Sequence, residues 1–335
     1  MNKYLWLLML LLISSNPYFA QPFLANPLDS LVNLAISLSE KALYAANFEE
    51  ARDIVDLSYF KRFEELDIEH EIQLTLQEIR VVGISNIVRY KRGDRQQIYN
   101  RLKVFSSQID QIDSKETLGN YYLALSALSR SVGKVDTART LEERALLTFK
   151  KIGDEEVVAR IQANQISRKH NQYLRAGKKE EILELIPVYQ DEIDFSTRYS
   201  KYALAYNTRH LGQIHRRQTQ NYSEALRLFK ASLSLREEIG FKPFIPASYS
   251  SLGDVYAKMG SDSLAIDMYE KAAELAIAIG FVRYQTYPYL CIGDIKKKQG
   301  EQLEAIKYYR IGLKYAAQNK YTTGIDNAIQ KISEE

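Results

Sequence analysis

The chain has 335 residues, of which 46% are hydrophobic and 26% are charged, and this balance excludes a chain that is disordered throughout. Its 45 basic and 42 acidic residues give a formal net charge of +3, too balanced to indicate nucleic acid or an anionic membrane as a partner. The single cysteine excludes a disulfide within the chain, and four histidines leave little material for a metal site.

The first predicted element is a secretory signal peptide over residues 1–20. Lys3 gives a positive start, an unbroken apolar run extends from Leu5 to Ile13, and cleavage is expected after Ala20. The run is shorter than the roughly 20 residues that a membrane-spanning helix needs. We therefore expect an exported protein, periplasmic or extracellular, with no stable membrane span after cleavage. The alternative is a protein anchored in the membrane by an uncleaved N-terminal segment.

From residue 28 to residue 320 the sequence predicts helix hairpins that repeat along the chain. The repeat is clearest over 205–320, weaker over 119–204 and degenerate over 28–118. The residue that marks the second helix of each hairpin recurs at Ala51, Ile98, Ala138, Ile182, Ala225, Ala265 and Ala305, and the last three markers are 40 residues apart. In the first helices, Gly212, Gly253 and Gly293 are 41 and then 40 residues apart. Self-similarity at such a period is the signature of a repeat protein.

Each hairpin carries two apolar stripes at helical spacing. In one repeat the stripes are Tyr249, Leu252, Gly253 and Tyr256 on the first helix and Ala265, Tyr269 and Ala272 on the second. Gly260 is expected to end the first helix in a left-handed conformation, and Ser261 or Asp262 to cap the second. These stripes are too small to form a core alone, so neighbouring hairpins are expected to stack.

Two further features modify the array. Pro187 lies inside a predicted second helix and is expected to bend or shorten it. Residues 321–335 predict a short amphipathic helix that covers the open end of the stack. Its apolar side is expected to carry Ile325, Ala328, Ile329 and Ile332, and its polar side Asn327, Gln330, Lys331 and Glu334.

These residues resemble the tetratricopeptide repeat family. The family pattern has Leu–Gly and then an aromatic residue on the first helix, and alanine, an aromatic residue and alanine on the second. Ser250–Ala272 matches at nearly every position, and Leu290–Gly312 matches except that Lys296 replaces the first-helix aromatic residue. The period is similar to that of the longer variety of the family. The resemblance implies an all-α fold, a right-handed α-solenoid of about seven hairpins with a C-terminal capping helix.

The sequence offers no candidate catalytic residue. Cys291 lies in an apolar stripe beside Ile292, where a buried and unreactive thiol is expected. His210 and His215 are five residues apart, so they do not share a helix face as metal ligands four apart would. The glycines fall at helix ends or packing contacts rather than in a phosphate-binding loop. We therefore expect no catalytic residue, no metal site and no cofactor.

The resemblance implies that the first helices line a groove that holds an extended peptide or a helix of a partner. The family register places these candidate partner-binding residues there: Asn171, Tyr206, Arg209, Gln213, Arg216, Arg217, Asp254, Lys258, Tyr287 and Asp294. The middle of this set is basic, so an acidic segment of a partner is a conceivable ligand. The alternative is that these residues are only solvated groove walls. Ser167 stands where the family's carboxylate-clamping set has its first lysine, so we expect no binding of a terminal carboxylate by that set.

The sequence therefore predicts a non-catalytic scaffold or adaptor whose partner is another protein or peptide. The second hypothesis is an extracytoplasmic sensor that binds a peptide or small ligand and signals by a change of superhelix shape. A hydrolase is the third, and no sequence feature supports it.

Overall fold

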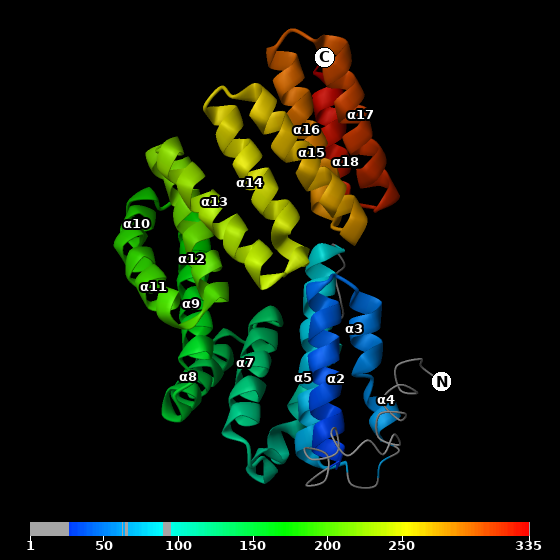
Figure 1. The fold of residues 1–335 in the computed structure, drawn as a ribbon, viewed down its shortest axis with the longest axis vertical. Coiled ribbons are helices and arrows are strands. Elements are labelled where there is room, and N and C mark those ends of the chain that lie inside the picture. The colour runs from blue at the N-terminus through cyan, green and yellow to red at the C-terminus, as the bar shows by residue number, and fades with distance from the viewer. Residues whose placement is uncertain (1–26, 62, 64–65, 90–94, 335) are drawn as a thin grey trace, which may run out of the picture. The chain divides into compact units, whose positions relative to one another are not determined.

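The computed structural model describes residues 27–61, 63, 66–89 and 95–334. The predicted signal peptide over residues 1–20 lies outside these residues. Every regular element of the described chain is a helix, which confirms the all-α prediction (Figure 1). The chain divides into two compact units, unit 1 (Met1–Ile87 and Lys91–Asp154) and unit 2 (Val88–Tyr90 and Glu155–Glu335).

Unit 1 contains the degenerate hairpins. Its helices pair as α2 with α3 and α7 with α8. The markers Ala51 and Ala138 are fully buried, whereas Ile98 is only partly buried because Tyr99 and Leu102 face the core instead. The elements of this unit are α2 (Pro27–Tyr44), α3 (Phe48–Ile54), α4 (Leu57–Phe60), α5 (Ile68–Val88), α6 (Arg95–Lys103), η1 (Val104–Ser107), η2 (Ile109–Gln111), α7 (Lys115–Ser131) and α8 (Val135–Ile152).

Unit 2 contains the better-matching hairpins. The first helices are α9, α12, α14 and α16, and each second helix packs on its own first helix and on the next one. The result is the stack of helix pairs that the repeat predicts (Figure 1). Its elements are α9 (Glu155–Arg175), α10 (Lys179–Leu183), α11 (Leu185–Tyr199), α12 (Lys201–Ile214), η3 (His215–Thr219), α13 (Tyr222–Ile239), η4 (Lys242–Phe244), α14 (Ile245–Lys258), α15 (Asp262–Ile279), α16 (Val282–Lys298), α17 (Gln302–Gln318) and α18 (Thr322–Ser333).

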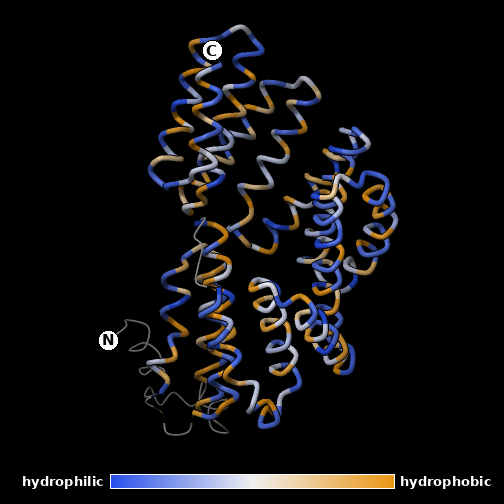
Figure 2. Tube along the Cα trace, turned by 180° about the vertical axis from the view of Figure 1, so that it is seen from behind, coloured by the Kyte–Doolittle hydropathy of each residue, from blue (hydrophilic) through white to orange (hydrophobic). Residues whose placement is uncertain are grey.

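Close packing of a glycine against an aromatic ring occurs in the three hairpins that begin with α12, α14 and α16. A Cβ atom added at Gly253 would lie 2.7 Å from Cε1 of Tyr269, and one at Gly212 would lie 2.9 Å from Cε1 of Phe229. Real side chains do not approach this closely, so only glycine fits at these positions. Hydrophobic and hydrophilic residues are interspersed along these helices (Figure 2), as expected of amphipathic helices in a stack.

The element termini confirm some expectations and correct others. Gly260 has a φ of +76°, as predicted. The second helix that contains Pro187 is broken at Glu184 into α10 and α11, because proline has no N–H and its ring clashes with the carbonyl four residues earlier. Ser261 is the N-cap residue of α15, as predicted, but its side chain makes no cap hydrogen bond.

The orientation predicted for the last helix is wrong in part. Ile329 is 52% exposed, whereas Tyr321, Gly324 and Ala328 are buried and Ile332 is partly buried. The buried stripe is rotated because Gly324 allows α18 to pack closely on Tyr321 and Ala316. Lys331 accordingly faces α16 and not the solvent side.

Candidate functional site

The ten residues predicted to bind a partner lie on the first helices of unit 2, and we call them the first-helix face. They come from α9, from α12 with η3, from α14 and from α16. Ser167 of α9 is hydrogen-bonded to Tyr206 of α12 at 2.9 Å, and Asn171 donates to Ser167 at 3.4 Å. Neighbouring first helices are thus joined through polar side chains.

The carboxylate of Asp254 is the centre of a polar network. Its Oδ2 accepts a 2.6 Å hydrogen bond from Nη1 of Arg216, and its Oδ1 accepts bonds of 2.8 Å from the hydroxyls of Tyr269 and Tyr287. The side chains of Arg216 and Asp254 are only 15% and 13% exposed. The structure therefore brings together three predicted site residues, Arg216, Asp254 and Tyr287, but it satisfies the charge of Arg216 internally.

The network also explains why Cys291 is unreactive. Burial, and next the charge of Asp254, raises the pKa of the Cys291 thiol to about 12. Burial likewise raises the pKa of both tyrosines. At neutral pH the thiol is protonated, so it cannot act as a thiolate nucleophile. The residue as a whole is of intermediate exposure, whereas the sequence predicts a buried thiol.

A π-helical segment, η3, positions the arginines. Gly212 and Ala225 are 13 residues apart, whereas Gly253 and Ala265 are 12 apart. The extra residue is absorbed in η3, where the helix widens before it ends at Gln220 with a φ of 55°. Arg216 and Arg217 both lie in this segment, so its widened turn sets their directions.

Three cations of the first-helix face, Arg209, Arg217 and Lys258, form no ion pair with any residue in the described part of the chain. Burial, and next the charge of Arg216, lowers the pKa of Arg217. Of the basic residues in the predicted set, Arg209, Arg217 and Lys258 are therefore available for a partner, whereas Arg216 is paired with Asp254. Gln213 is partly buried beside them.

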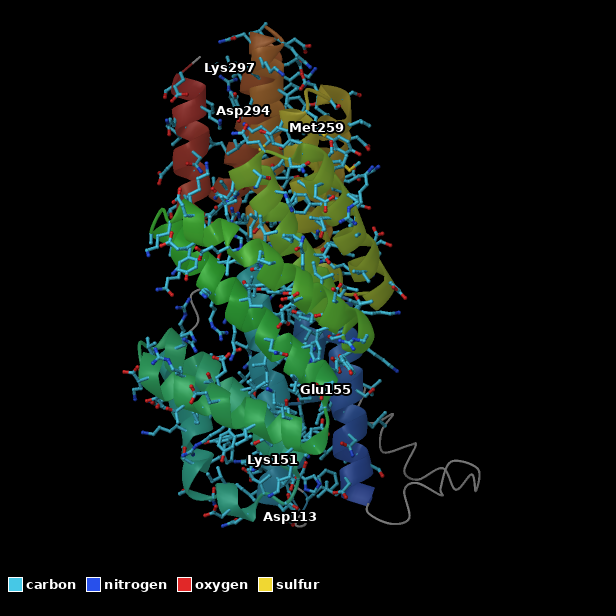
Figure 3. All side chains as sticks on the ribbon, turned by 90° about the vertical axis from the view of Figure 1, so that its left-hand side faces the viewer. Asp113, Lys151, Glu155, Met259, Asp294 and Lys297 are labelled. Carbon is cyan, nitrogen blue, oxygen red and sulfur yellow. The ribbon has the colours of Figure 1, made fainter. Side chains whose placement is uncertain are left out.

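Asp294 repeats the role of Asp254 one hairpin later. Its Oδ1 accepts a 2.9 Å hydrogen bond from the hydroxyl of Tyr309 and a 2.6 Å bond from Nζ of Lys331. Figure 3 labels Asp294 on α16 together with Lys297, which is exposed. Asp294 is thus engaged with α18.

Sequence reasoning missed a buried arginine in α13. Arg236 is 8% exposed, and its Nη1 donates to the carbonyl of Phe244 at 3.1 Å and to Oγ of Ser248 at 2.7 Å. Burial, and next the charge of Arg209, lowers the pKa of Arg236 to about 9. The signal was present in the sequence, because the residues 40 and 80 positions later are Ala276 and Ala316.

Sequence reasoning also missed a buried cluster of histidines. The ring centroids of His170 and His210 are 5.7 Å apart, and the ring of Tyr189 stacks on His210 at 6.0 Å. Burial, and next the charge of Arg217, lowers the pKa of His170 to about 4, and the pKa of His210 lies well below its ordinary value. Both imidazoles are therefore neutral near pH 7. His215 is partly exposed and bonds to Thr219, so His210 and His215 do point apart as predicted.

Among the described residues, no group of three or more histidine, cysteine, aspartate or glutamate side chains could hold a metal ion. None of the described helices is both long and apolar enough to cross a membrane.

Comparison with known proteins identifies the repeat. Residues 202–278, which span all but the outermost residues of α12 to α15, match the tetratricopeptide repeat family. This part of the chain is therefore similar to tetratricopeptide repeats. No curated protein matches the chain.

Solved structures show the same fold at low sequence identity. BtubC from P. vanneervenii is 14% identical with a TM-score of 0.53, and the match covers 68% of this chain and 92% of that one. The apo form of RapI is 15% identical with a TM-score of 0.52, covering 91% and 87%. A signal-transduction ATPase with a tetratricopeptide repeat sensor from Pyrococcus horikoshii is 16% identical with a TM-score of 0.53, covering 85% and 42%.

Proposed function

We propose that this protein is an exported, non-catalytic adaptor that binds an acidic segment of a partner protein through its first-helix face. The observation that carries the proposal is that Arg209, Arg217 and Lys258 form no ion pair with any described residue. Carboxylates of a partner would form charge-assisted hydrogen bonds with these side chains. The repeat fold supports the proposal, because stacked hairpins present an extended surface to peptides and proteins.

The Asp254 network supports this surface without taking part in binding. Its bonds to Arg216, Tyr269 and Tyr287 link three successive hairpins and hold the first helices in register. Because Arg216 is already paired, it serves as a positioning residue. The neighbouring Arg217 is exposed and carries the charge that a partner meets.

The test compares two double variants with the same change of charge. Arg209→Glu with Arg217→Glu reverses the first-helix face. Arg227→Glu with Arg310→Glu reverses exposed arginines on the second helices α13 and α17. Partners are identified by affinity purification from the cell envelope, and affinities are then measured by calorimetry with the purified partner.

We expect the first double variant to lose at least tenfold in affinity and the second to bind as the wild type does. Binding to the wild type should weaken as NaCl is raised, because exposed charges are screened over about 8 Å at physiological ionic strength. Circular dichroism should show equal helix content in all three proteins. Wild-type affinity in the Arg209→Glu, Arg217→Glu protein would refute the proposed face.

Export is the second part of the proposal. The charged start, the short apolar run and Ala20 support cleavage that leaves Gln21, or a residue close to it, as the new N-terminus. N-terminal sequencing of protein from the cell envelope tests this. Soluble cytosolic protein that retains Met1 would contradict export, and envelope protein that retains Met1 would indicate the anchored alternative.

A ligand sensor is the second candidate function, and the ion pair of Arg216 with Asp254 favours it. A ligand that took Arg216 from Asp254 would also release the carboxylate that holds Tyr287 of the next hairpin. Binding would then change how successive hairpins are joined. Solution X-ray scattering with and without ligand would show a changed radius of gyration for a sensor and an unchanged one for a rigid adaptor.

A further inference from the structure

The junction between α13 and α14 differs from the next junction in the stack. Arg236 occupies the column in which Ala276 and Ala316 are fully buried. The first turn of the following first helix is the 3₁₀ turn η4, whereas the equivalent residues of the next repeat begin α16 directly. The carbonyl of Phe244 at the end of η4 accepts a hydrogen bond from Arg236. This junction is therefore built around a guanidinium group.

The charge of that guanidinium has no counter-charge. Within the residues that the structure describes, Arg236 pairs with no carboxylate, and only its Nη1 makes hydrogen bonds. A guanidinium has five N–H donors, so the Nε and Nη2 donors are left without a protein acceptor. An unpaired buried cation is strongly unfavourable, and natural proteins supply such groups with an anion or a full set of hydrogen bonds.

A second guanidinium without a partner comes from the same hairpin. The Nε of Arg209 is buried and has no acceptor among the described residues. Arg209 is the charged group with the greatest influence on the pKa of Arg236, which it lowers, and Tyr202, Tyr206 and Tyr284 act in the opposite direction. A 2.7 Å hydrogen bond from Ser232 to the carbonyl of Ala205 fixes α13 on α12 here.

We propose that Arg209 and Arg236 form a binding site for one oxyanion group, a phosphate or a carboxylate, which supplies the missing counter-charge. Both groups accept the paired N–H donors of a guanidinium edge in bidentate geometry. The phenol hydroxyls can donate to the remaining oxygens. The site shares Arg209 with the first-helix face, but it requires no protein partner.

The test titrates the purified protein with sodium phosphate and, separately, with sodium acetate, against NaCl at equal ionic strength. We expect a saturable rise in Tm with phosphate or acetate beyond that with NaCl, and calorimetry should give one site per chain. A response to only one of the two salts identifies the anion as phosphate or carboxylate. An absence of any rise beyond NaCl with both salts would overturn the proposal.

Two variants assign the response to the residues. Arg236→Met should abolish the anion-specific rise in Tm, while Arg227→Met, on the exposed side of the same helix, should retain it. Should Arg236→Met fail to fold, Arg209→Gln, at a partly exposed position, is expected to lower the anion affinity at least tenfold. An unchanged anion response in Arg209→Gln would refute the site. Because this test uses no protein ligand, a negative result would not refute the proposed binding of a partner protein. That proposal would then be tested with Arg217→Glu alone, since Arg217 does not belong to the anion site.

Discussion

Substitution of alanine for Gly253 tests the packing that defines the hairpins. The added Cβ would lie 2.7 Å from Cε1 and 2.8 Å from Cδ1 of Tyr269, which are atoms of a rigid ring. The ring cannot move away freely, because its hydroxyl donates a 2.8 Å hydrogen bond to Asp254. We therefore expect Gly253→Ala to destabilise unit 2, although alanine is the better helix former.

The magnitude follows from three contributions. Alanine stabilises a helix by about 1 kcal/mol relative to glycine. Overpacking costs about 1–3 kcal/mol, and loss of the Tyr269 hydrogen bond costs about 1 kcal/mol. The balance is a destabilisation of about 2 kcal/mol, which corresponds to a decrease in Tm of about 4–8 °C for a domain of this size.

Urea unfolding followed by far-ultraviolet circular dichroism measures the effect. In the background of Tyr269→Leu, which removes the ring, Gly253→Ala should be neutral or stabilising by up to about 1 kcal/mol. The control Lys297→Ala, at an exposed position on α16 (Figure 3), should change stability by less than about 0.5 kcal/mol. The reasoning is refuted if Gly253→Ala raises the Tm, or if its cost is the same with and without the ring.

Two further predictions concern charge. Folding lowers the pKa of His170 from 6.5 to about 4, so the unfolded chain binds a proton at a higher pH than the folded chain does. The free energy of unfolding should therefore be highest above pH 6.5 and should fall by about 3 kcal/mol as the pH is lowered to 4. Urea titrations across this range should show a flatter profile for His170→Gln, and equal profiles would contradict the prediction. Asp254→Asn leaves Arg216 buried without a counter-charge and should cost about 2–4 kcal/mol. Asp294→Asn, with a side chain 48% exposed, should cost less than about 1 kcal/mol by thermal denaturation, and equal costs would contradict the difference in burial.

The fold could be predicted because the residues that pack the hairpins recur at a fixed spacing in the sequence. Gly253 and Tyr269 recur 40 residues later as Gly293 and Tyr309. Such a repeated pattern can be recognised in the sequence without knowing which side chains are in contact. The break at Pro187 was predictable for a similar reason, since it depends on the backbone of one helix alone. Ile329 was misplaced because the side of α18 that is buried depends on Gly324 and its contacts.

The site was less predictable because its pairing is set between hairpins. Arg216 and Asp254 are 38 residues apart, and their contact depends on the widened turn of η3. A register drawn on an ideal α-helix therefore places Arg209, Arg216 and Arg217 together in the candidate set, whereas in the structure Arg216 is paired with Asp254 and Arg217 is exposed. Arg236 lies on a second helix, where the family register places no binding residue.

The extra residue in η3 has a consequence for how such an array can change its binding preference. An insertion within an α-helix turns every later side chain by about 100° and would normally disturb all the packing beyond it. Here the helix ends at Gln220, and α13 begins at Tyr222 with Ala225 still 40 residues before Ala265. The length change is confined to the segment that carries Arg216 and Arg217. A loss or gain of one residue at this point could therefore alter specificity during evolution, or in design, while the neighbouring repeats keep their places.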